Sequence, residues 1–428
     1  MEKLFIEGGR PLRGTARITG AKNAALPILA ASVMVKGPIY IYNVPDLLDI
    51  HVMLDILHSL GVKVLFLGDK LMVDATNMNH SDIPENLMSK MRSSIFLMGP
   101  LLARYGQVTL YQPGGCAIGE RKIDMHIDGL RALGATIYER GDRIECCASK
   151  LYGADLVLDY PSVGATENLM MAAVTAEGTT TITNAAREPE IADLQLFLNR
   201  MGARVYGAGT GTITIEGVSH LHTCEHTIIP DRIVAGTLMI AAAATRGNVI
   251  LEGIIAGHLN SVTHALRRLG VQVVVDDGTM IISGVNRVRA IERIVTSPYP
   301  SFPTDLQAQM MVLLSLAEGV SIIKETVFES RFKHVHELSV MGADIRVDSH
   351  SAIIRGVPRL YGATVEATDL RAGAALVIAG LVAVGTTVIE QIHHIDRGYD
   401  RIDAIFHRLG GRIERTISIE TEQIASSM

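Results

Sequence analysis

The chain has 428 residues, of which 48% are hydrophobic and 20% charged, and its formal net charge is −6. This length predicts two or more domains, and this composition argues against a disordered chain. The net negative charge argues against sequence-independent binding of nucleic acid, although it leaves room for a local basic pocket that binds a phosphorylated metabolite.

No feature of a secretion signal or a membrane span stands out in the sequence. Residues 1–6 carry neither a basic start nor a long apolar core. The most apolar stretch, residues 372–389, is interrupted by glycine and favours a buried helix followed by a strand. Four cysteines in a chain of this size do not suggest a disulfide framework, and the neighbours Cys146 and Cys147 should point to opposite faces of a strand. We therefore expect a cytoplasmic protein.

Six similar repeats follow one another along the chain. Each contains a Leu-Gly or Met-Gly pair that follows an amphipathic helical stretch and precedes a strand hairpin, and successive pairs are roughly 70 residues apart. The glycines of these pairs are Gly61, Gly134, Gly202, Gly270, Gly342 and Gly410. Each glycine stands where a left-handed helix stop is expected. The period predicts six copies of one supersecondary structure.

The first half of each repeat also recurs, as an apolar helix followed by a glycine and a β-branched strand. Residues 168–178 lead into a strand at 179–183, and residues 237–247 lead into another at 248–251. Because these helices are apolar almost all round, we expect them to be buried on every side, with the sheets outside. The predicted repeat is β-α-β-α-β-β in an α/β protein. Six repeats are too many for one core, so we expect three plus three, with a boundary at residues 224–230.

A glycine-rich loop at residues 112–121 surrounds Cys116. Three glycines and a proline favour an exposed thiol, and the nearby Arg121 favours its thiolate form. Such a group could act as a nucleophile or as a proton donor. The alternative is a hairpin turn that contains an incidental cysteine.

Cations and carboxylates lie at the ends of the repeated helices. Lys22 precedes Asn23, a reasonable N-cap, and a lysine at that end opposes the helix dipole unless an anion binds there. Arginines at similar positions suit a phosphate or carboxylate ligand; they are Arg92, Arg121, Arg331, Arg371 and Arg397. Asp305 and Asp369 could cap helices, and Asp305 could also be a general base. Each of these residues could instead be an ordinary surface or capping residue.

Neither a metal site nor a nucleotide-binding fingerprint is predicted. His334 and His336 are two residues apart and would not share a helix face, and no cluster has zinc-ligand spacing. No glycine-rich phosphate loop follows a strand.

Several motifs in order resemble the family of UDP-N-acetylglucosamine 1-carboxyvinyltransferases, and the likeness covers essentially the whole chain. The motifs are GAKNAALP at 20–27, PGGCAIGER at 113–121, SVGAT at 162–166, NAAREPE at 184–190, FPTDLQAQ at 302–309, TDLRA at 368–372 and HIDRGY at 394–399. The resemblance implies two three-repeat domains, residues 22–229 and residues 1–21 plus 230–428, each an inside-out α/β barrel.

The resemblance also implies an activity and a site. The enzyme would transfer the enolpyruvyl group of phosphoenolpyruvate to the 3′-hydroxyl of UDP-N-acetylglucosamine, the first committed step of peptidoglycan synthesis, without a metal or organic cofactor. Four residues would be catalytic. Cys116 would be the proton donor and the target of fosfomycin, and Asp305 would be the base. Lys22 and Arg397 would bind phosphoenolpyruvate. The wider substrate-binding set would be Lys22, Asn23, Arg92, Arg121, Lys122, Ile123, Asp124, Met125, Ser162, Val163, Gly164, Asp305, Val327, Arg331, Asp369, Arg371 and Arg397. Lys122 departs from the family pattern, which usually has proline there.

Three alternatives compete with this interpretation. The sister enzyme that acts on shikimate 3-phosphate shares the architecture but as a family lacks the cysteine loop. A non-catalytic repeat scaffold would tolerate the loss of Lys22, Cys116, Asp305 and Arg397. A cysteine hydrolase would pair Cys116 with His126 and ignore phosphoenolpyruvate.

Overall fold

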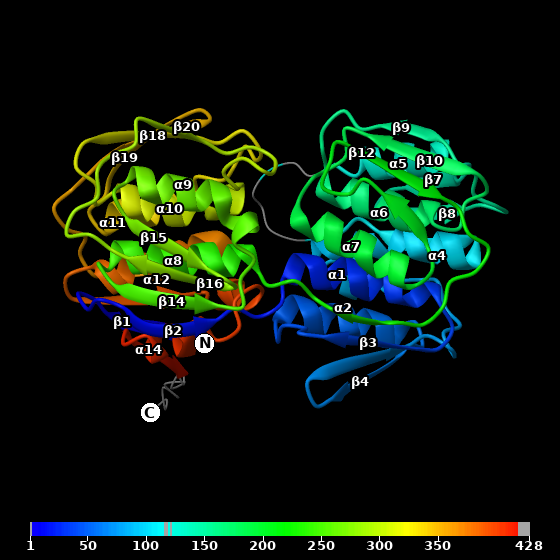
Figure 1. Cartoon of the computed structure of the whole chain (residues 1–428), viewed down its shortest axis with the longest axis horizontal. Helices are drawn as coiled ribbons and strands as arrows, with labels where there is room; N and C mark the ends of the chain where they lie inside the picture. The colour runs from blue at the N-terminus through cyan, green and yellow to red at the C-terminus, as the bar shows by residue number, and fades with distance from the viewer. Residues whose placement is uncertain (1, 115–118, 120–121, 418–428) are drawn as a thin grey trace, which may run out of the picture. The chain divides into compact units, whose positions relative to one another are not determined.

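The computed structural model describes residues 2–114, 119 and 122–417 (Figure 1). The chain divides into two compact units. Unit 1 holds the described residues of 1–18, 232–297 and 302–428, and unit 2 holds Thr19–Asp231 and Pro298–Ser301. Among the described residues, no helix combines the length and the hydropathy that a membrane span requires.

The described residues of unit 2 form three sheets, with strand orders β13-β3-β5-β4, β6-β8-β7 and β11-β12-β10-β9. Its strands are β3 (Pro38–Tyr42), β4 (Lys63–Leu67), β5 (Lys70–Asp74), β6 (Gln107–Tyr111), β7 (Thr136–Arg140), β8 (Arg143–Cys147), β9 (Asp155–Val157), β10 (Thr179–Thr183), β11 (Arg204–Tyr206), β12 (Thr212–Glu216) and β13 (Glu225–Thr227). Its helices are α1 (Lys22–Ala31), α2 (Leu48–Ser59), α3 (Glu85–Met88), α4 (Met98–Tyr105), α5 (Asp124–Ala132), α6 (Val163–Ala173) and α7 (Pro189–Arg200), with 3₁₀ turns η1 (Ser32–Met34) and η2 (Arg92–Leu97).

Unit 1 contains sheets with strand orders β21-β22-β1-β23, β15-β16-β14-β2 and β17-β18-β20-β19. Its strands are β1 (Glu2–Glu7), β2 (Arg13–Arg17), β14 (Asn248–Glu252), β15 (Gln272–Asp276), β16 (Thr279–Ser283), β17 (Arg293–Val295), β18 (Val320–Lys324), β19 (Asp344–Asp348), β20 (Ser351–Arg355), β21 (Thr364–Glu366), β22 (Thr386–Glu390) and β23 (Arg412–Ile417). Its helices are α8 (Arg232–Ala244), α9 (Asn260–Arg268), α10 (Gln307–Leu314), α11 (His334–Val340), α12 (Leu370–Val382), α13 (His393–Asp396) and α14 (Ile402–Arg408), with η3 (Ala256–Leu259) and η4 (Thr304–Leu306).

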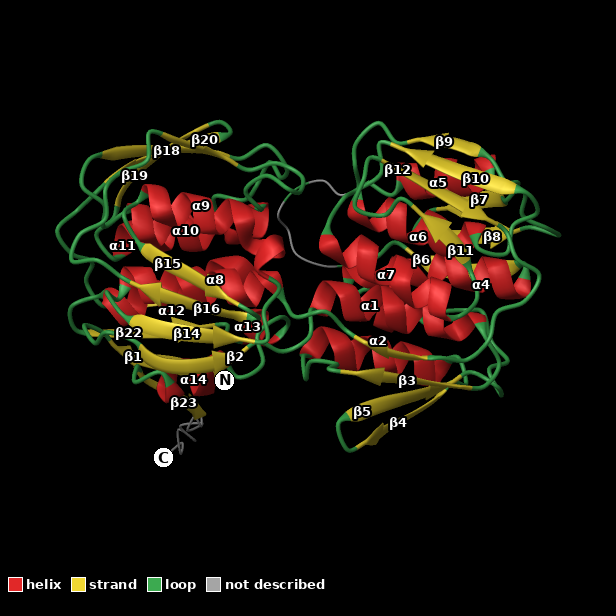
Figure 2. Cartoon of the chain, in the orientation of Figure 1, coloured by secondary structure: helices red, strands yellow, loops and turns green. Residues whose placement is uncertain are grey.

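One strand pattern recurs in the sheets of both units (Figure 2). In the sheet at β9–β12, for example, β9 pairs parallel with β10, and the remaining pairs are antiparallel. Along the chain this sheet follows the order β9-α6-β10-α7-β11-β12. At β6-β8-β7 the parallel edge strand is reduced to an isolated bridge from Asp82 to Thr109. The α/β class predicted from the sequence is confirmed.

The six repeated glycines end helices, as their sequence context predicts. All six have left-handed backbone angles, with φ between +86° and +97°. Glycine reaches this region without the strain that a Cβ would cause, so the helix can stop and the chain can turn into the next strand.

The most apolar helices are buried on all sides because they have no polar face to turn to water. All thirteen residues of α8 are buried, and α12 is buried from Leu370 to Leu381. At Gly236 in α8, a Cβ would lie 2.3 Å from the Leu306 side chain, so a larger residue would require that side chain to shift. Each unit has its own hydrophobic core. Cys146 is buried and Cys147 exposed, as predicted for neighbours in a strand.

One carboxyl group is buried inside the core of unit 2. Glu167 in α6 is 0% exposed, and neither of its oxygens has a hydrogen-bond partner among the described residues. Burial raises its pKa well above the ordinary 4.5, and the charges of Glu190 and Glu188 raise it further. Glu167 is therefore protonated in the folded protein at pH values where the unfolded chain has lost the proton.

Glu167→Gln is expected to stabilise the protein above pH 5, because unfolding then no longer gains from ionisation of this carboxyl. The pH-dependent part of the difference in the free energy of unfolding should grow by up to about 1.4 kcal/mol per pH unit and vanish near pH 4. Thermal melts of wild type, Glu167→Gln and the partly exposed control Glu216→Gln at pH 4 to 8 check this. A constant difference between Glu167→Gln and wild type across that range would show that Glu167 is ionised in the fold.

Candidate active site

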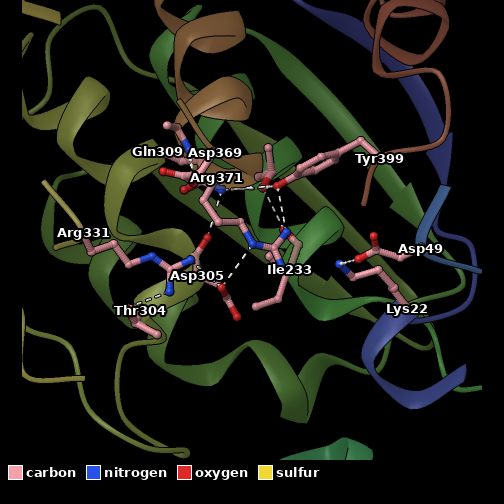
Figure 3. Close-up of polar contacts among 12 residues, drawn as sticks. Lys22, Asp49, Ile233, Thr304, Asp305, Gln309, Arg331, Asp369, Arg371 and Tyr399 are labelled. Atoms are coloured by element: carbon pink, nitrogen blue, oxygen red, sulfur yellow. Dashed lines mark hydrogen bonds and ion pairs between the residues drawn. The ribbon is translucent and has the colours of Figure 1, made fainter. Parts of the chain in front are cut away.

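In unit 2, Lys22 is the first residue of α1 and has a buried carboxylate as its partner. Its Nζ donates to Asp49 Oδ2 at 2.8 Å, and the two side chains are 10% and 5% exposed (Figure 3). Its backbone N–H donates to Asp231 Oδ2 at 3.3 Å. The lysine that opposes the helix dipole is thus stabilised by Asp49, which the sequence did not single out. The expected N-cap is wrong: Ala21 is the N-cap, and Asn23 lies inside the helix.

In unit 1, Asp305 is held by two arginines that come from different elements. Arg331 Nη2 donates to Asp305 Oδ1 at 2.7 Å, and Arg371 Nε, from α12, donates to the same oxygen at 3.1 Å (Figure 3). The arginine side chains are 5% and 8% exposed, whereas that of Asp305 is 27% exposed. No hydrogen bond from another described residue reaches Asp305 Oδ2. The carboxylate is fixed through one oxygen and can accept a hydrogen bond through the other.

The charges around Asp305 determine its protonation state. Burial alone would raise the pKa of Asp305. This effect is outweighed by the positive charges of Arg371 and Arg331, by the hydrogen bond from Arg331 and by the charge of Arg232. The pKa is therefore held far below its ordinary value, and the carboxylate is ionised at any physiological pH. Asp305 belongs to the 3₁₀ turn η4 and caps no helix, whereas Asp369 caps α12 as the sequence suggested, by accepting from the N–H groups of Arg371 and Ala372.

Arg371 is in turn oriented by a buried polar network. Its Nη1 donates to the Tyr399 hydroxyl at 3.4 Å, and that hydroxyl lies 2.9 Å from Thr237 Oγ1. Gln309 Nε2 donates to Thr237, to Tyr399 and to the backbone oxygen of Asp305, at 3.2, 3.3 and 3.0 Å. The apolar helices α8 and α10 thus carry Thr237 and Gln309, which contact the Tyr399 hydroxyl that accepts from Arg371 of α12. Only Arg371 of these was predicted from the sequence.

A buried asparagine joins three of the elements that carry or adjoin predicted sugar-nucleotide residues of unit 2. Asn168 Nδ2 lies 3.0 Å from the His126 ring and 3.2 Å from the oxygen of Ile95, and its Oδ1 accepts from Gly99 N at 2.6 Å. Asn168 thereby joins α6 to α5 and to η2. Ser162 precedes α6, Lys122 and Ile123 precede α5, and Arg92 is the first residue of η2. Arg92 Nη2 donates to the backbone oxygen of Lys122 at 3.3 Å.

Within this group, single residues have clear local roles. Ser162 is the N-cap of α6 and accepts from Ala165 N. Gly164 lies beside His126: a Cβ added there would be 3.4 Å from the ring, an ordinary contact distance. Asp124 accepts from the N–H of Met125 at 2.9 Å, and Val163 is half-buried. Cys116 and Arg121, which the sequence placed at the centre of the chemistry, lie outside the described residues.

The last predicted residues of unit 1 are at the ends of short segments. Val327 follows β18, and its N–H donates to Glu325 Oε1 at 2.8 Å. Arg397 follows α13 and is half-buried. The pKa of His394 is lowered mainly by burial, then by the charge of His393 and then by that of Arg397. Within the described ranges, no group of histidine, cysteine, aspartate or glutamate could hold a metal ion.

Comparisons with known proteins agree with one another. The family model described as EPSP synthase (3-phosphoshikimate 1-carboxyvinyltransferase) matches residues 6–405. The chain is 52% identical over 417 residues to UDP-N-acetylglucosamine 1-carboxyvinyltransferase 2 of Carboxydothermus hydrogenoformans, covering 97% of this chain and 99% of that one. It is 50% identical over 424 residues to UDP-N-acetylglucosamine 1-carboxyvinyltransferase of Finegoldia magna, covering 98% and 100%.

Solved structures share the fold. The enolpyruvyl transferase NikO from Streptomyces tendae is similar with a TM-score of 0.88 at 26% identity, over 97% of this chain and 99% of that one. EPSP synthase from Acinetobacter baumannii is similar with a TM-score of 0.76 at 18% identity, over 97% and 100%, which is a likeness of fold. The chain therefore belongs to the enolpyruvyl transferase family, and its identity of about half over nearly its whole length groups it with the UDP-N-acetylglucosamine 1-carboxyvinyltransferases.

Proposed function

We propose that the protein transfers the enolpyruvyl group of phosphoenolpyruvate to the 3′-hydroxyl of UDP-N-acetylglucosamine and releases phosphate, in the cytoplasm and without a cofactor. The observation that carries this proposal is the Asp305 carboxylate, which two arginines hold through Oδ1 while Oδ2 can accept a hydrogen bond. That arrangement suits a hydroxyl that must be oriented and deprotonated beside an anionic co-substrate. The relatives named for this reaction support the choice of substrates.

We further propose how the residues divide the work. Cys116 gives a proton to the methylene carbon of phosphoenolpyruvate, the 3′-oxygen attacks C2, and Asp305 accepts the hydroxyl proton. The tetrahedral ketal then loses a methyl proton and phosphate, which leaves the enol ether. Because the pKa of Asp305 is so low, it holds the proton only transiently, and its main contribution is to fix the attacking oxygen.

We propose the following roles in substrate binding. Lys22 and Arg397 would bind phosphoenolpyruvate, and Arg331, Arg371 and Arg121 would add positive charge. The sugar nucleotide would contact Asn23, Arg92, residues 121–125 and 162–164, Asp305, Val327 and Asp369. We propose that units 2 and 1 are the two domains of the family, each an inside-out α/β barrel.

Lys22→Ala is expected to lower kcat/KM for phosphoenolpyruvate at least about tenfold, because it removes a charge-assisted hydrogen bond to the anion, worth about 1.5–3 kcal/mol. The substitution also removes the ion pair that Lys22 forms with the buried Asp49 carboxylate, which destabilises the fold. The double variant Lys22→Ala with Asp49→Ala removes that second effect. Steady-state kinetics and melting temperatures should show stability recovered and activity still lost, whereas recovered activity would mean that Lys22 only balances Asp49. Lys63→Ala, an exposed site in β4, is the control.

Phosphate release from phosphoenolpyruvate tests the proposed function as a whole. Release should require UDP-N-acetylglucosamine and should not occur with shikimate 3-phosphate, the substrate class named in the family model's description. Release with shikimate 3-phosphate instead would assign the chain to the sister reaction. Absence of release with either acceptor would favour a non-catalytic scaffold.

A further inference from the structure

A buried glutamate outside the predicted site connects two of its parts. Glu325 follows β18 and is 1% exposed. Its Oε1 accepts from the N–H groups of Val327 and Phe328 at 2.8 and 3.2 Å, and its Oε2 accepts from the Thr304 hydroxyl at 2.9 Å. Among the described residues no lysine or arginine forms an ion pair with it. A buried carboxylate is costly unless donors satisfy it, and here three neutral donors do so.

The hydroxyl of Thr304 relays this contact to Arg331. Thr304 has a single hydroxyl proton, which points to Glu325, so its lone pairs are left to accept from Arg331 Nη1 at 3.1 Å. Arg331 Nη2 then donates to Asp305 Oδ1 at 2.7 Å (Figure 3). The four residues form a chain of hydrogen bonds whose direction is fixed at one end by the glutamate.

Glu325 also holds Arg331 from a second side. The N–H of Phe328 donates to Glu325, and the ring of Phe328 lies 5.2 Å from the Arg331 guanidinium carbon. This distance is within the range of a cation–π contact. The same turn carries Val327. The Glu325 carboxylate therefore fixes two groups that contact the Arg331 guanidinium: the Thr304 hydroxyl and the Phe328 ring. It also fixes the backbone of Val327, a predicted substrate contact.

We infer that Glu325 is a positioning residue of the active site: it orients Arg331, and through it Asp305, toward the hydroxyl of the acceptor sugar. The inference rests on the proposed function, since it assigns Glu325 a part in binding and orienting that acceptor. It differs from a purely local role, in which Glu325 would do no more than close the turn after β18.

Only a carboxylate can satisfy all the contacts at once. A glutamine whose NH₂ replaced Oε1 would face two N–H donors. A glutamine whose NH₂ replaced Oε2 would donate to Thr304 Oγ1, and the threonine proton would then turn toward Arg331, which is itself a donor. Glu325→Gln therefore breaks the relay in either orientation while it keeps the size of the side chain. Thr304→Val breaks the same relay from the other partner, and Thr304→Ser preserves it.

The experiment measures steady-state kinetics with phosphoenolpyruvate and UDP-N-acetylglucosamine, together with melting temperature. Glu325→Gln and Thr304→Val should each lower kcat/KM for the sugar nucleotide at least about tenfold, since each disrupts the orientation of a charged hydrogen-bond donor. The double variant Glu325→Gln with Thr304→Val should have a kcat/KM little below that of either single variant, because either change already breaks the relay. Thr304→Ser should stay within about threefold of wild type, less than the loss of one such contact.

Glu318→Gln is the matched control, because Glu318 lies on the surface of the same unit in an ion pair with Arg287. Wild-type kinetics in Glu325→Gln, with only a lower melting temperature, would reduce Glu325 to a turn-closing residue. If the losses in kcat/KM of the two single variants simply multiplied in the double variant, Glu325 and Thr304 would act independently, which would contradict the relay. A wild-type enzyme inactive with UDP-N-acetylglucosamine would instead refute the proposed function, and this inference with it.

Discussion

Asp305→Ala is expected to lower kcat by about 100- to 10,000-fold, the range for loss of a positioned general base, and to weaken binding of UDP-N-acetylglucosamine far less. The reason is the geometry of the carboxylate. Arg331 and Arg371 fix Oδ1, so Oδ2 presents its lone pairs in one direction, and the benefit of that alignment is greatest as the hydroxyl proton leaves. Kinetics and calorimetry on the same preparations measure the two effects separately.

Two further variants make the test of Asp305 specific. Asp305→Asn keeps the size of the side chain but removes the charge between the arginines, so it should lose turnover as the alanine does. Asp344→Ala, on the surface strand β19, should leave both quantities unchanged. If the affinity for the sugar nucleotide fell in proportion to kcat, Asp305 would be a binding residue and another group would be the base.

Cys116→Ser is expected to abolish labelling by fosfomycin and to lower turnover by about 100- to 10,000-fold, because a hydroxyl is too weak an acid to replace the thiol as proton donor. Cys116→Asp should escape the drug and keep some turnover, since a carboxylic acid can donate a proton. These expectations rest on the glycine-rich motif and the family resemblance. Intact-mass measurement and peptide mapping report the adduct.

The other cysteines provide the controls for this labelling. Burial raises the pKa of Cys146 to about 12 and that of Cys224 to about 11, so their thiolates are scarce at neutral pH. Cys147 is exposed on β8 and is the strictest control: Cys147→Ser should label as wild type does. An adduct at Cys147 would contradict the assignment of Cys116 as the fosfomycin target. Full activity in Cys116→Ser would contradict its assignment as the proton donor.

The fold was predictable because its signals are local and repeated. The glycine after each Leu or Met marks a left-handed helix end, and all six glycines adopt that conformation. Helices without a polar face, such as α8, had to be buried. The assignment of Pro298–Ser301 to unit 2 was not predictable, because no composition shift separates this segment from its neighbours in the chain.

The predicted site residues come mainly from motifs, and a motif does not state what its residues contact. Lys22, Asp305 and Arg371 stand in motifs, and Arg331 was singled out only as one of the recurring arginines. Asp49 is 27 positions from Lys22 and reads as one more polar residue of an amphipathic helix. Glu325, Tyr399 and Gln309 act through contacts between segments far apart in the sequence, which only tertiary packing creates. The capping role expected for Asn23 was wrong because α1 already begins at Lys22.

The central claim is tested most directly by identifying the product. The protein is incubated with phosphoenolpyruvate and UDP-N-acetylglucosamine, and the mixture is followed by proton and phosphorus NMR. We expect vinyl protons of an enolpyruvyl ether on the 3′-oxygen of the sugar and one inorganic phosphate for each ether formed. Phosphate accompanied by free pyruvate, with the sugar nucleotide unchanged, would contradict enolpyruvyl transfer.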